Sequence, residues 1–229
     1  MIWIEKSLDV LAFIYALLFF PAPVFWLLIH SGIRFWRRVG NRALLWIAAP
    51  LWAANAAALE ALHSRLFAER IPRNAFTAAA GAALVIAGLA IGHHVHRVFG
   101  LKRLGGLPEV SPGRYRRDVV ERGVYAYVRH PRYLEYMLSF AGWSLLTGAR
   151  GILVLAIASV LMYSFVAPLE ERELRNERGE AYSAYARAVP RFIPRLRRPA
   201  RRPDGEGPED GPGGAEDAPR QTTPGGFHA

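Results

Sequence analysis

The stretch that decides the fold is residues 10–33, VLAFIYALLFFPAPVFWLLIHSGI, which runs for 24 residues without Asp, Glu, Lys or Arg. A helix needs about 20 apolar residues to cross the hydrocarbon core of a bilayer. We therefore expect an all-α, polytopic membrane protein with about five transmembrane helices. The first stretch is too long for the core of a signal peptide, so we expect it to be a retained anchor. The other stretches free of these charged residues are 43–59, 74–96, 136–149 and 151–169.

Two of these stretches are short for a span. Residues 43–59 gain length if the helix continues past Glu60 to Leu62. Residues 136–149 gain length if the span starts at Tyr133, which places Glu135 inside it. A charge at the centre of a membrane helix costs roughly 2.5–3.5 kcal/mol. We therefore expect Glu135 to point into the protein and not into lipid.

The basic residues predict the orientation. Arg and Lys outnumber Asp and Glu by 29 to 19, which in a soluble protein would suggest nucleic acid as the partner. Here they lie between apolar stretches, which favours anionic lipid headgroups as the partner instead. The loops on one side of the expected membrane hold 23 of them and the loops on the other side hold 5. The positive-inside rule then predicts an outside N-terminus and a cytoplasmic C-terminus.

Composition divides the chain into three parts. Residues 1–75 hold two spans and no pattern that suggests chemistry, whereas residues 76–198 form the core of the protein. Within that core, a charged helix is expected after Pro168, followed by a cytoplasmic amphipathic helix that ends before Pro190. That helix carries Tyr182, Tyr185 and Val189 on one face. Residues 199–229 are rich in Pro, Gly and acidic residues, so we expect a disordered tail.

Several kinds of site are excluded or disfavoured. The sequence has no cysteine, which excludes disulfides, Cys-ligated metals and thiol catalysis. His93, His94 and His96 stand close together, but interfacial polar residues at the end of a span explain them better than a metal site does. The glycines in residues 100–106, GLKRLGG, lack the strand and helix that a phosphate-binding loop requires. We predict no metal.

The segment 123–135, GVYAYVRHPRYLE, is the best candidate for a binding site. Pro131 suits the first turn of a helix, where its missing N–H costs nothing. The free amides of that turn would receive a carboxylate or a phosphate. Cationic and aromatic side chains surround this turn, and an interfacial aromatic belt with Arg residues would produce the same pattern. These side chains are Tyr125, Tyr127, Arg129, His130, Arg132 and Tyr133.

The same segment resembles the isoprenylcysteine carboxyl methyltransferase and phospholipid N-methyltransferase family of integral membrane methyltransferases. The first block of the resemblance is Gly123-x-Tyr125-x-Tyr127-x-Arg129-His130-Pro131-x-Tyr133. The second block consists of Glu170-Glu171, Gly179, Tyr182, Tyr185, Val189-Pro190-Arg191 and Pro194. The likeness covers roughly residues 110–194 in two ordered blocks.

The resemblance implies a methyltransferase that uses S-adenosyl-L-methionine, encloses it between the last spans and cytoplasmic segments, and receives a lipophilic acceptor from the bilayer. The acceptor would be a lipid, an isoprenoid or a small hydrophobic molecule, and no catalytic residue is assigned. Residues 117–120 would line the same pocket by position. The residues carried over as cofactor-binding are Tyr125, His130, Pro131, Arg132, Tyr133, Glu170 and, in support, Glu171.

Two departures from the family pattern bear on function. Val166 stands where family members often have an Arg that is implicated in acceptor handling, which weakens the case for a carboxylate acceptor. Glu135 stands where a small residue is usual. Two alternatives therefore remain, namely a related membrane reductase that uses a nicotinamide cofactor and a non-catalytic membrane scaffold or transport component. The sequence names neither the acceptor nor the atom that is methylated.

Overall fold

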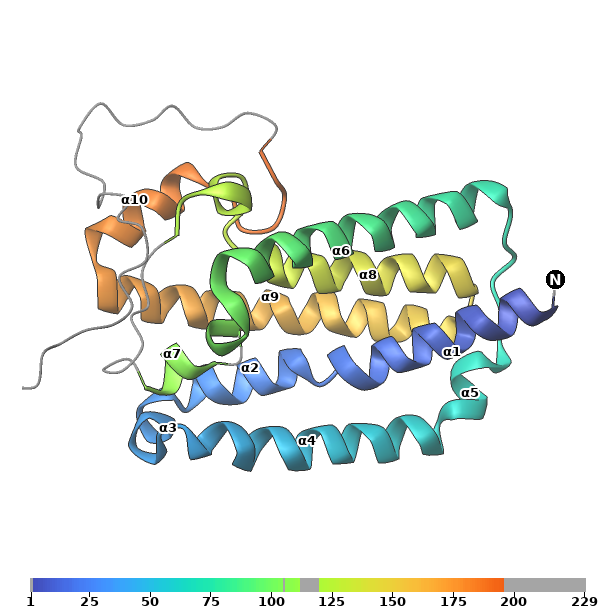
Figure 1. Cartoon of the computed structure of the whole chain (residues 1–229), viewed down its shortest axis with the longest axis horizontal. Helices are drawn as coiled ribbons and strands as arrows, with labels where there is room; N and C mark the ends of the chain where they lie inside the picture. The colour runs from blue at the N-terminus through green and yellow to red at the C-terminus, as the bar shows by residue number, and fades with distance from the viewer. Residues whose placement is uncertain (1, 105, 112–119, 196–229) are drawn as a thin grey trace, which may run out of the picture. The chain divides into compact units, whose positions relative to one another are not determined.

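The computed structural model describes residues 2–104, 106–111 and 120–195, and these residues form helices and connecting segments without a strand. The helices of this part of the chain lie side by side as a bundle (Figure 1). The helices that belong to residues 1–104 are α1 (Ile2–Phe19), α2 (Ala22–Ser31), α3 (Ile33–Val39), α4 (Arg42–Ala61), α5 (His63–Ala68) and α6 (Ala75–Leu104). They are followed by α7 (Leu107–Val110), the 3₁₀ helix η1 (Gly123–Ala126), α8 (Pro131–Thr147), α9 (Arg150–Arg178) and α10 (Glu180–Ala188).

Four helical segments of the described part are long and apolar enough to cross a membrane: Trp3–Ser31, Leu44–Ala61, Ala75–Val98 and Arg150–Arg178. The remaining expected span is α8, whose 17 residues correspond to about 26 Å of helix. That length is slightly below the roughly 30 Å of a hydrocarbon core. α8 packs against both α6 and α9 within the bundle (Figure 1). The prediction of an all-α multi-pass membrane protein with about five spans is confirmed.

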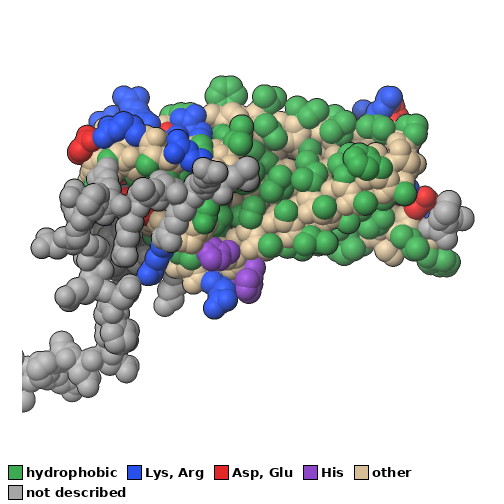
Figure 2. All heavy atoms as spheres, turned by 90° about the horizontal axis from the view of Figure 1, so that it is seen from above, with side chains coloured by type: hydrophobic (Ala, Val, Ile, Leu, Met, Phe, Trp, Pro, Cys, Tyr) green, Lys and Arg blue, Asp and Glu red, His purple; other side chains and the backbone are tan. Residues whose placement is uncertain are grey.

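The outer face of the bundle is apolar. Large hydrophobic side chains point away from it, among them Phe76, which is 81% exposed, and Leu45, which is 72% exposed. Figure 2 shows hydrophobic side chains over the length of the bundle and charged side chains gathered toward its ends. A water-soluble protein rarely exposes so large a continuous apolar surface, whereas a bilayer solvates it.

The prolines within the predicted spans differ in their effect on the helices. The first span is broken at Pro21, where α1 ends and α2 begins. Pro50 and Pro168 instead lie inside unbroken helices. The charged helical segment expected after Pro168 is present as the continuation of α9. α6 also continues beyond residue 96, where its uncharged stretch ends, as far as Leu104.

Glycine lets α6 and α8 approach closely. A Cβ added at Gly81 would lie 2.9 Å from the carbonyl oxygen of Gly142, and one added at Gly88 would lie 2.2 Å from the hydroxyl oxygen of Ser139. Small residues at such positions favour helix packing in membranes, where apolar burial drives association little. One turn further, Gly92 faces the carboxylate of Glu135. Glu135 therefore points toward a neighbouring helix, as expected.

The amphipathic helix near the C-terminal end is α10. Tyr182, Tyr185 and Val189 pack together on its buried face, which confirms the face predicted from their spacing. The tail predicted over 199–229 lies outside the described residues. The division into residues 1–75, 76–198 and 199–229 stays a prediction.

Candidate functional site

The two sequence blocks that carry the family resemblance meet through their backbones. The amide of Arg129 donates to the carbonyl of Pro190 at 2.9 Å, and the amide of His130 donates to the carbonyl of Arg191 at 3.2 Å. The amide of Arg195 donates in turn to the carbonyl of Tyr127 at 3.1 Å. The segment after α10 thus runs along the segment that enters α8. Residues about 60 positions apart in sequence are held together at the start of one membrane helix.

The start of α8 has the features predicted for it. His130 is the residue before the helix, Pro131 occupies its first turn, and no side chain caps the helix. The first amides of a helix have no partner within it, and proline removes one of them. The amides of Arg132 and Tyr133 therefore form the positive end of the helix dipole, which suits a carboxylate or a phosphate.

Glu171 on α9 is fully buried and surrounded by cations. Nε and Nη2 of Arg191 donate to its two oxygens at 2.8 and 2.9 Å. Nη2 of Arg175 donates to Oε2 at 3.1 Å, and Nη1 of Arg129 lies 3.2 Å from Oε1. Nε2 of His130 is 3.1 Å from the same Oε1. These contacts join α9, the entrance to α8 and the segment after α10, so this carboxylate holds the parts of the site together.

Glu170 is adjacent in sequence but has a different environment. Its side chain is 22% exposed. The Tyr133 hydroxyl donates to its Oε2 at 2.8 Å, and His130 Nδ1 lies 3.4 Å from the same oxygen. The rings of His130 and Tyr133 stack with their centroids 5.2 Å apart. Glu170 is therefore the carboxylate of this pair that is positioned at an accessible surface.

Charge at this site changes the protonation of His130. Burial would lower the pKa of this imidazole, but hydrogen bonds to Glu170 and Glu171 outweigh burial and raise the pKa above its ordinary value. The pKa of the Arg191 guanidinium is also raised, first by its hydrogen bonds to Glu171. The site therefore holds His130 in its cationic form to a higher pH than water would.

The other residues carried over from the family lie around this pair. Arg132 turns toward α2, where its guanidinium carbon is 5.3 Å from the centre of the Trp26 ring, and its Nε donates to the Tyr136 hydroxyl at 3.2 Å. The carbonyl of Tyr125 accepts a hydrogen bond from Tyr185 at 2.8 Å. Burial raises the pKa of the Tyr125 phenol, and the nearby charge of Glu170 raises it further. The charge of Glu170, which Tyr133 contacts, therefore also reaches the Tyr125 phenol.

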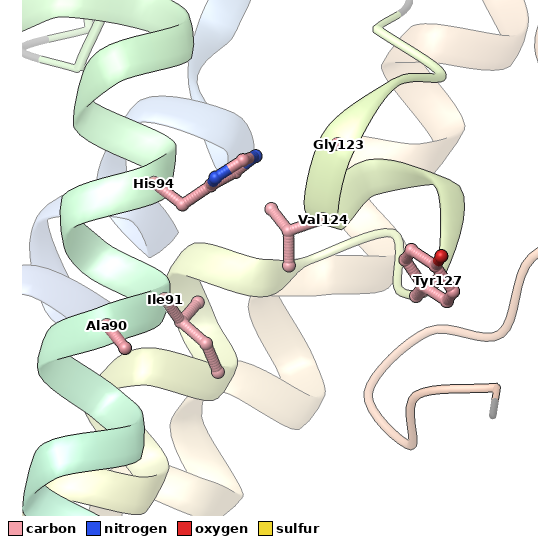
Figure 3. A pocket seen from close by; sticks show the side chains of 6 residues that line it. All are labelled: Ala90, Ile91, His94, Gly123, Val124 and Tyr127. Carbon is pink, nitrogen blue, oxygen red and sulfur yellow. The ribbon is translucent and has the colours of Figure 1, made fainter.

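A second feature lies on the other side of η1. A cavity of about 460 Å³ opens between α6 and η1 (Figure 3). In a 3₁₀ helix, residues three apart share a face, so Val124 and Tyr127 both face this cavity while Tyr125 does not. The ring of His94 reaches across from α6 toward Gly123, where a Cβ would lie 2.3 Å from its Nε2. The cavity is lined by Ala90, Ile91, His94, Gly123, Val124 and Tyr127.

The structure brings together most of the residues predicted as a site. His130, Tyr133, Glu170 and Glu171 are in direct contact, and Pro131 begins the helix between them. Residues 117–119 of the segment 117–120 lie outside the described residues. The described part contains no group of three or more His, Asp or Glu side chains that could hold a metal ion.

Sequence reasoning missed the cations around Glu171. Arg175 follows Glu171 by four residues, a spacing that predicts contact on a helix. Arg191 was part of the second block, but nothing local in the sequence identifies Glu171 as its partner. The reasoning also overlooked Glu173, whose carboxylate pairs with the buried His30 of α2 at 3.0 Å.

Comparisons with known proteins agree with this geometry. The model of the phospholipid methyltransferase family matches residues 76–179, which include α8 and both carboxylates of the site. No solved structure matches the chain. Three curated relatives match stretches of 85 to 118 residues, and the chain spans about a third to two-fifths of their length.

The cobalt-zinc-cadmium resistance protein CzcN of Cupriavidus metallidurans is 38% identical over 85 residues, which is 37% of this chain and 39% of the relative. Methanethiol S-methyltransferase 2 of Bradyrhizobium diazoefficiens is 36% identical over 88 residues, 38% of this chain and 32% of the relative. Methanethiol S-methyltransferase of Pseudomonas deceptionensis is 31% identical over 118 residues, 50% of this chain and 42% of the relative. The resemblance read from the two sequence blocks is confirmed, since residues 76–179 match the model of the phospholipid methyltransferase family.

Proposed function

We propose that this protein transfers a methyl group from S-adenosyl-L-methionine to a lipophilic or small hydrophobic acceptor at the cytoplasmic face of the membrane. The observation that carries the proposal is the meeting of the two family blocks at the start of α8. There, Tyr133 and His130 lie beside the partly exposed carboxylate of Glu170. The family match over residues 76–179 supports the reaction type.

The residues present fit the methyl donor. Its carboxylate suits the amides at the start of α8, after His130 and Pro131, where no side chain caps the helix. Glu170 suits its ammonium group or its ribose hydroxyls. Tyr125 and Tyr133 offer aromatic faces to a purine or to a sulfonium cation.

The donor supplies a methyl group activated by a positively charged sulfur. Methyl transfer is an in-line displacement, so the protein contributes mainly by aligning the two molecules and excluding water. Glu171 acts in support, because its four cationic neighbours fix the segments that carry the binding residues. Arg132 is held against Trp26 and helps to fix the first turn of α8.

A small thiol is the acceptor that the observations favour within the broader class of lipids, isoprenoids and small hydrophobic molecules. Two of the relatives described above are named for methyl transfer to methanethiol. The cavity between α6 and η1 is lined mainly by apolar side chains and has room for a small hydrophobic molecule. Val166 is fully buried and apolar, so it offers no charge to an acceptor carboxylate.

We also propose that the end of the bundle with η1 and α10 faces the cytoplasm and that the N-terminus lies outside. The excess of Lys and Arg in the loops of that end supports this orientation. Reporter fusions after Arg38 and Arg198 should then read cytoplasmic, and a fusion after Arg70 should read extracytoplasmic. A cytoplasmic signal after Arg70 would contradict the orientation.

The direct test is titration of the purified protein with S-adenosylhomocysteine. Hydrogen bonds that involve a charged partner contribute about 1.5–3 kcal/mol, so Glu170→Gln should weaken binding at least about tenfold. Glu180→Gln is the matched control, because Glu180 is exposed on α10 and pairs only with the exposed Arg187 among described residues. Glu173 is unsuitable as a control because it has a buried partner. Equal effects at positions 170 and 180 would remove Glu170 from the binding site.

The relative named as a cobalt-zinc-cadmium resistance protein favours a second candidate, a membrane component without catalysis. Incubation of membranes with methyl-labelled S-adenosylmethionine separates the two, because only a methyltransferase produces a labelled product. Titration with NADPH tests a related reductase in the same preparation. Binding of NADPH without binding of S-adenosylhomocysteine would replace the proposal with the reductase.

A further inference from the structure

Glu135 is a carboxylate inside a membrane-spanning helix, one turn after Pro131. Among the described residues it forms no hydrogen bond and no ion pair, and its side chain is partly buried. Holding a charge at such a depth costs roughly 2.5–3.5 kcal/mol when the charge is near the bilayer centre. Ionisable residues in membrane helices therefore usually have a function, and none has been given to Glu135 above.

The neighbouring helix is shaped to receive this side chain. A Cβ added at Gly92 of α6 would lie 2.4 Å from Oε1 and 2.8 Å from Oε2 of Glu135. Real Cβ atoms do not come so close to other heavy atoms, so any other residue at position 92 would make the flexible carboxylate turn to a new position. The Glu135 carboxylate thus occupies the space that the missing side chain of Gly92 leaves open.

Polar groups from several elements surround the carboxylate. Its charge interacts with Arg132 on α8, Tyr125 on η1, Tyr15 on α1 and Tyr163 on α9. The hydroxyl of Tyr163 is fully buried and has no hydrogen-bond partner in the described part of the chain. Tyr125 also interacts with Glu170, so Glu135 belongs to the same polar interior as the proposed donor site.

The carboxylate also lies beside the apolar cavity. Gly92, which contacts Glu135, directly follows Ile91, which lines the cavity. Successive residues of a helix point about 100° apart, so the carboxylate and the cavity occupy adjacent faces of α6 at the same level. An acceptor with its apolar body in the cavity in Figure 3 would have His94 of α6 in the cavity wall and Glu135 of α8 beside Gly92, next to the wall.

We infer that Glu135 is a catalytic residue that takes the proton from a thiol acceptor during methyl transfer. This inference rests on the proposed function, including its thiol acceptor, and adds to it the destination of the thiol proton. The acceptor sulfur forms a bond to the methyl carbon as the bond between that carbon and the donor sulfur breaks. The electron pair of the broken bond neutralises the donor sulfonium, and the S–H proton passes to the Glu135 carboxylate.

The kinetic test uses ethanethiol as the probe and compares the wild-type protein with Glu135→Gln. A positioned general base contributes about 10²–10⁴-fold, so transfer at pH 7 should fall at least about 100-fold. The defect should narrow as the pH rises, because the thiol then ionises in water and needs no base. Affinity for S-adenosylhomocysteine should stay within about twofold, and Glu135→Asp should recover part of the rate.

Each other kinetic result has a separate meaning. A defect of constant size at every pH, or no defect, would overturn the role of Glu135. If His94→Gln lowered the transfer rate at pH 7 but less at higher pH, and Glu135→Gln did not lower it, His94 would be the group that takes the proton. A wild-type protein that binds S-adenosylhomocysteine but does not methylate ethanethiol would overturn the thiol inference alone. A wild-type protein that binds no S-adenosylhomocysteine would overturn the proposed function itself.

A measurement of thermal stability tests the contact between Gly92 and Glu135 without an activity assay. Gly92→Ala should lower the apparent Tm in detergent only slightly, because the Glu135 carboxylate is the flexible end of its side chain and can turn away from the added methyl group. In a Glu135→Ala background the space is vacant, and the same Gly92→Ala substitution should not lower the Tm. An equal loss in both backgrounds would show that the carboxylate does not occupy this space.

Discussion

The two ends of the helix bundle hold their ion pairs in different ways. At the end with η1 and α10, four cationic side chains converge on the fully buried Glu171. At the opposite end, each carboxylate has one Arg partner among the described residues, and the pairs are partly or fully exposed. These pairs are Arg70–Asp9, Arg73–Glu5 and Arg150–Glu69.

The difference shows which end of the molecule is built around charge. A buried ion pair requires the removal of its members from water, which costs several kcal/mol for each ion unless other groups compensate. Such an arrangement is seldom the most effective way to stabilise a fold, whereas exposed pairs between surface side chains cost and contribute little. The buried cluster lies where the two family blocks meet, so its position fits the binding of a charged ligand.

The largest effect that separates the two ends should come from Glu171→Gln. The substitution leaves several guanidinium groups facing a neutral amide in a buried place. Breaking a buried ion pair typically destabilises a protein by about 3–5 kcal/mol. We expect a poor yield of monodisperse protein and a lower apparent Tm in detergent. The matched substitution Glu69→Gln should leave both unchanged, and equal losses would abolish the distinction between the ends.

A smaller effect is expected from Arg191→Gln, which removes both hydrogen bonds from Arg191 to Glu171. Bonds to charged groups contribute about 1.5–3 kcal/mol, and the partial exposure of Arg191 places the expected loss toward the lower limit. Arg191→Lys should give an intermediate loss, because an ammonium keeps the charge but not the paired geometry. Chemical denaturation in detergent measures the free energy of unfolding of both variants. If Arg191→Lys lowered it as much as Arg191→Gln does, the paired hydrogen-bond geometry, and not the charge, would be the stabilising feature.

The pH dependence of stability should sharpen the comparison further. Folding raises the pKa of His130, so the protonated imidazole stabilises the folded state fully at a pH below its unfolded-state pKa of about 6.5. This stabilisation is lost as the pH rises through the higher pKa that His130 has in the folded protein. It amounts to roughly 1.4 kcal/mol for each unit of the shift. His130→Gln should flatten this fall of stability with pH, and an unchanged pH profile would show that another group titrates.

The smallest effect is expected at the opposite end. Glu5→Gln removes the partner of Arg73, whose Nη2 lies 2.8 Å from the Glu5 carboxylate. Exposed pairs contribute about 0–1 kcal/mol and are screened by salt. The change in apparent Tm should therefore be slight in low salt and absent at high ionic strength. A salt-independent loss at Glu5 would show that this end also depends on a buried interaction.

Much of the candidate site was accessible from sequence because its signals are local. Pro131 at the first turn of a helix, the ring of Tyr133 beside it and the Glu170–Glu171 pair each stand within a short ordered motif. The interpretation of Glu135 as a side chain directed into the protein followed from the cost of a charge in lipid. The different roles of Glu170 and Glu171 did not follow from sequence, because the two residues are adjacent and chemically identical.

By itself, the sequence determined that this chain is a helical membrane protein, since about 20 apolar residues without charge have few other stable environments in a cell. It also indicated the resemblance to membrane methyltransferases, through two motif blocks that occur in order. Only the tertiary structure decided which carboxylate is buried among cations and which is left accessible, because that depends on Arg191 arriving from beyond α10. It likewise decided that Gly92 lies opposite Glu135, since contacts between helices depend on packing that no local pattern records.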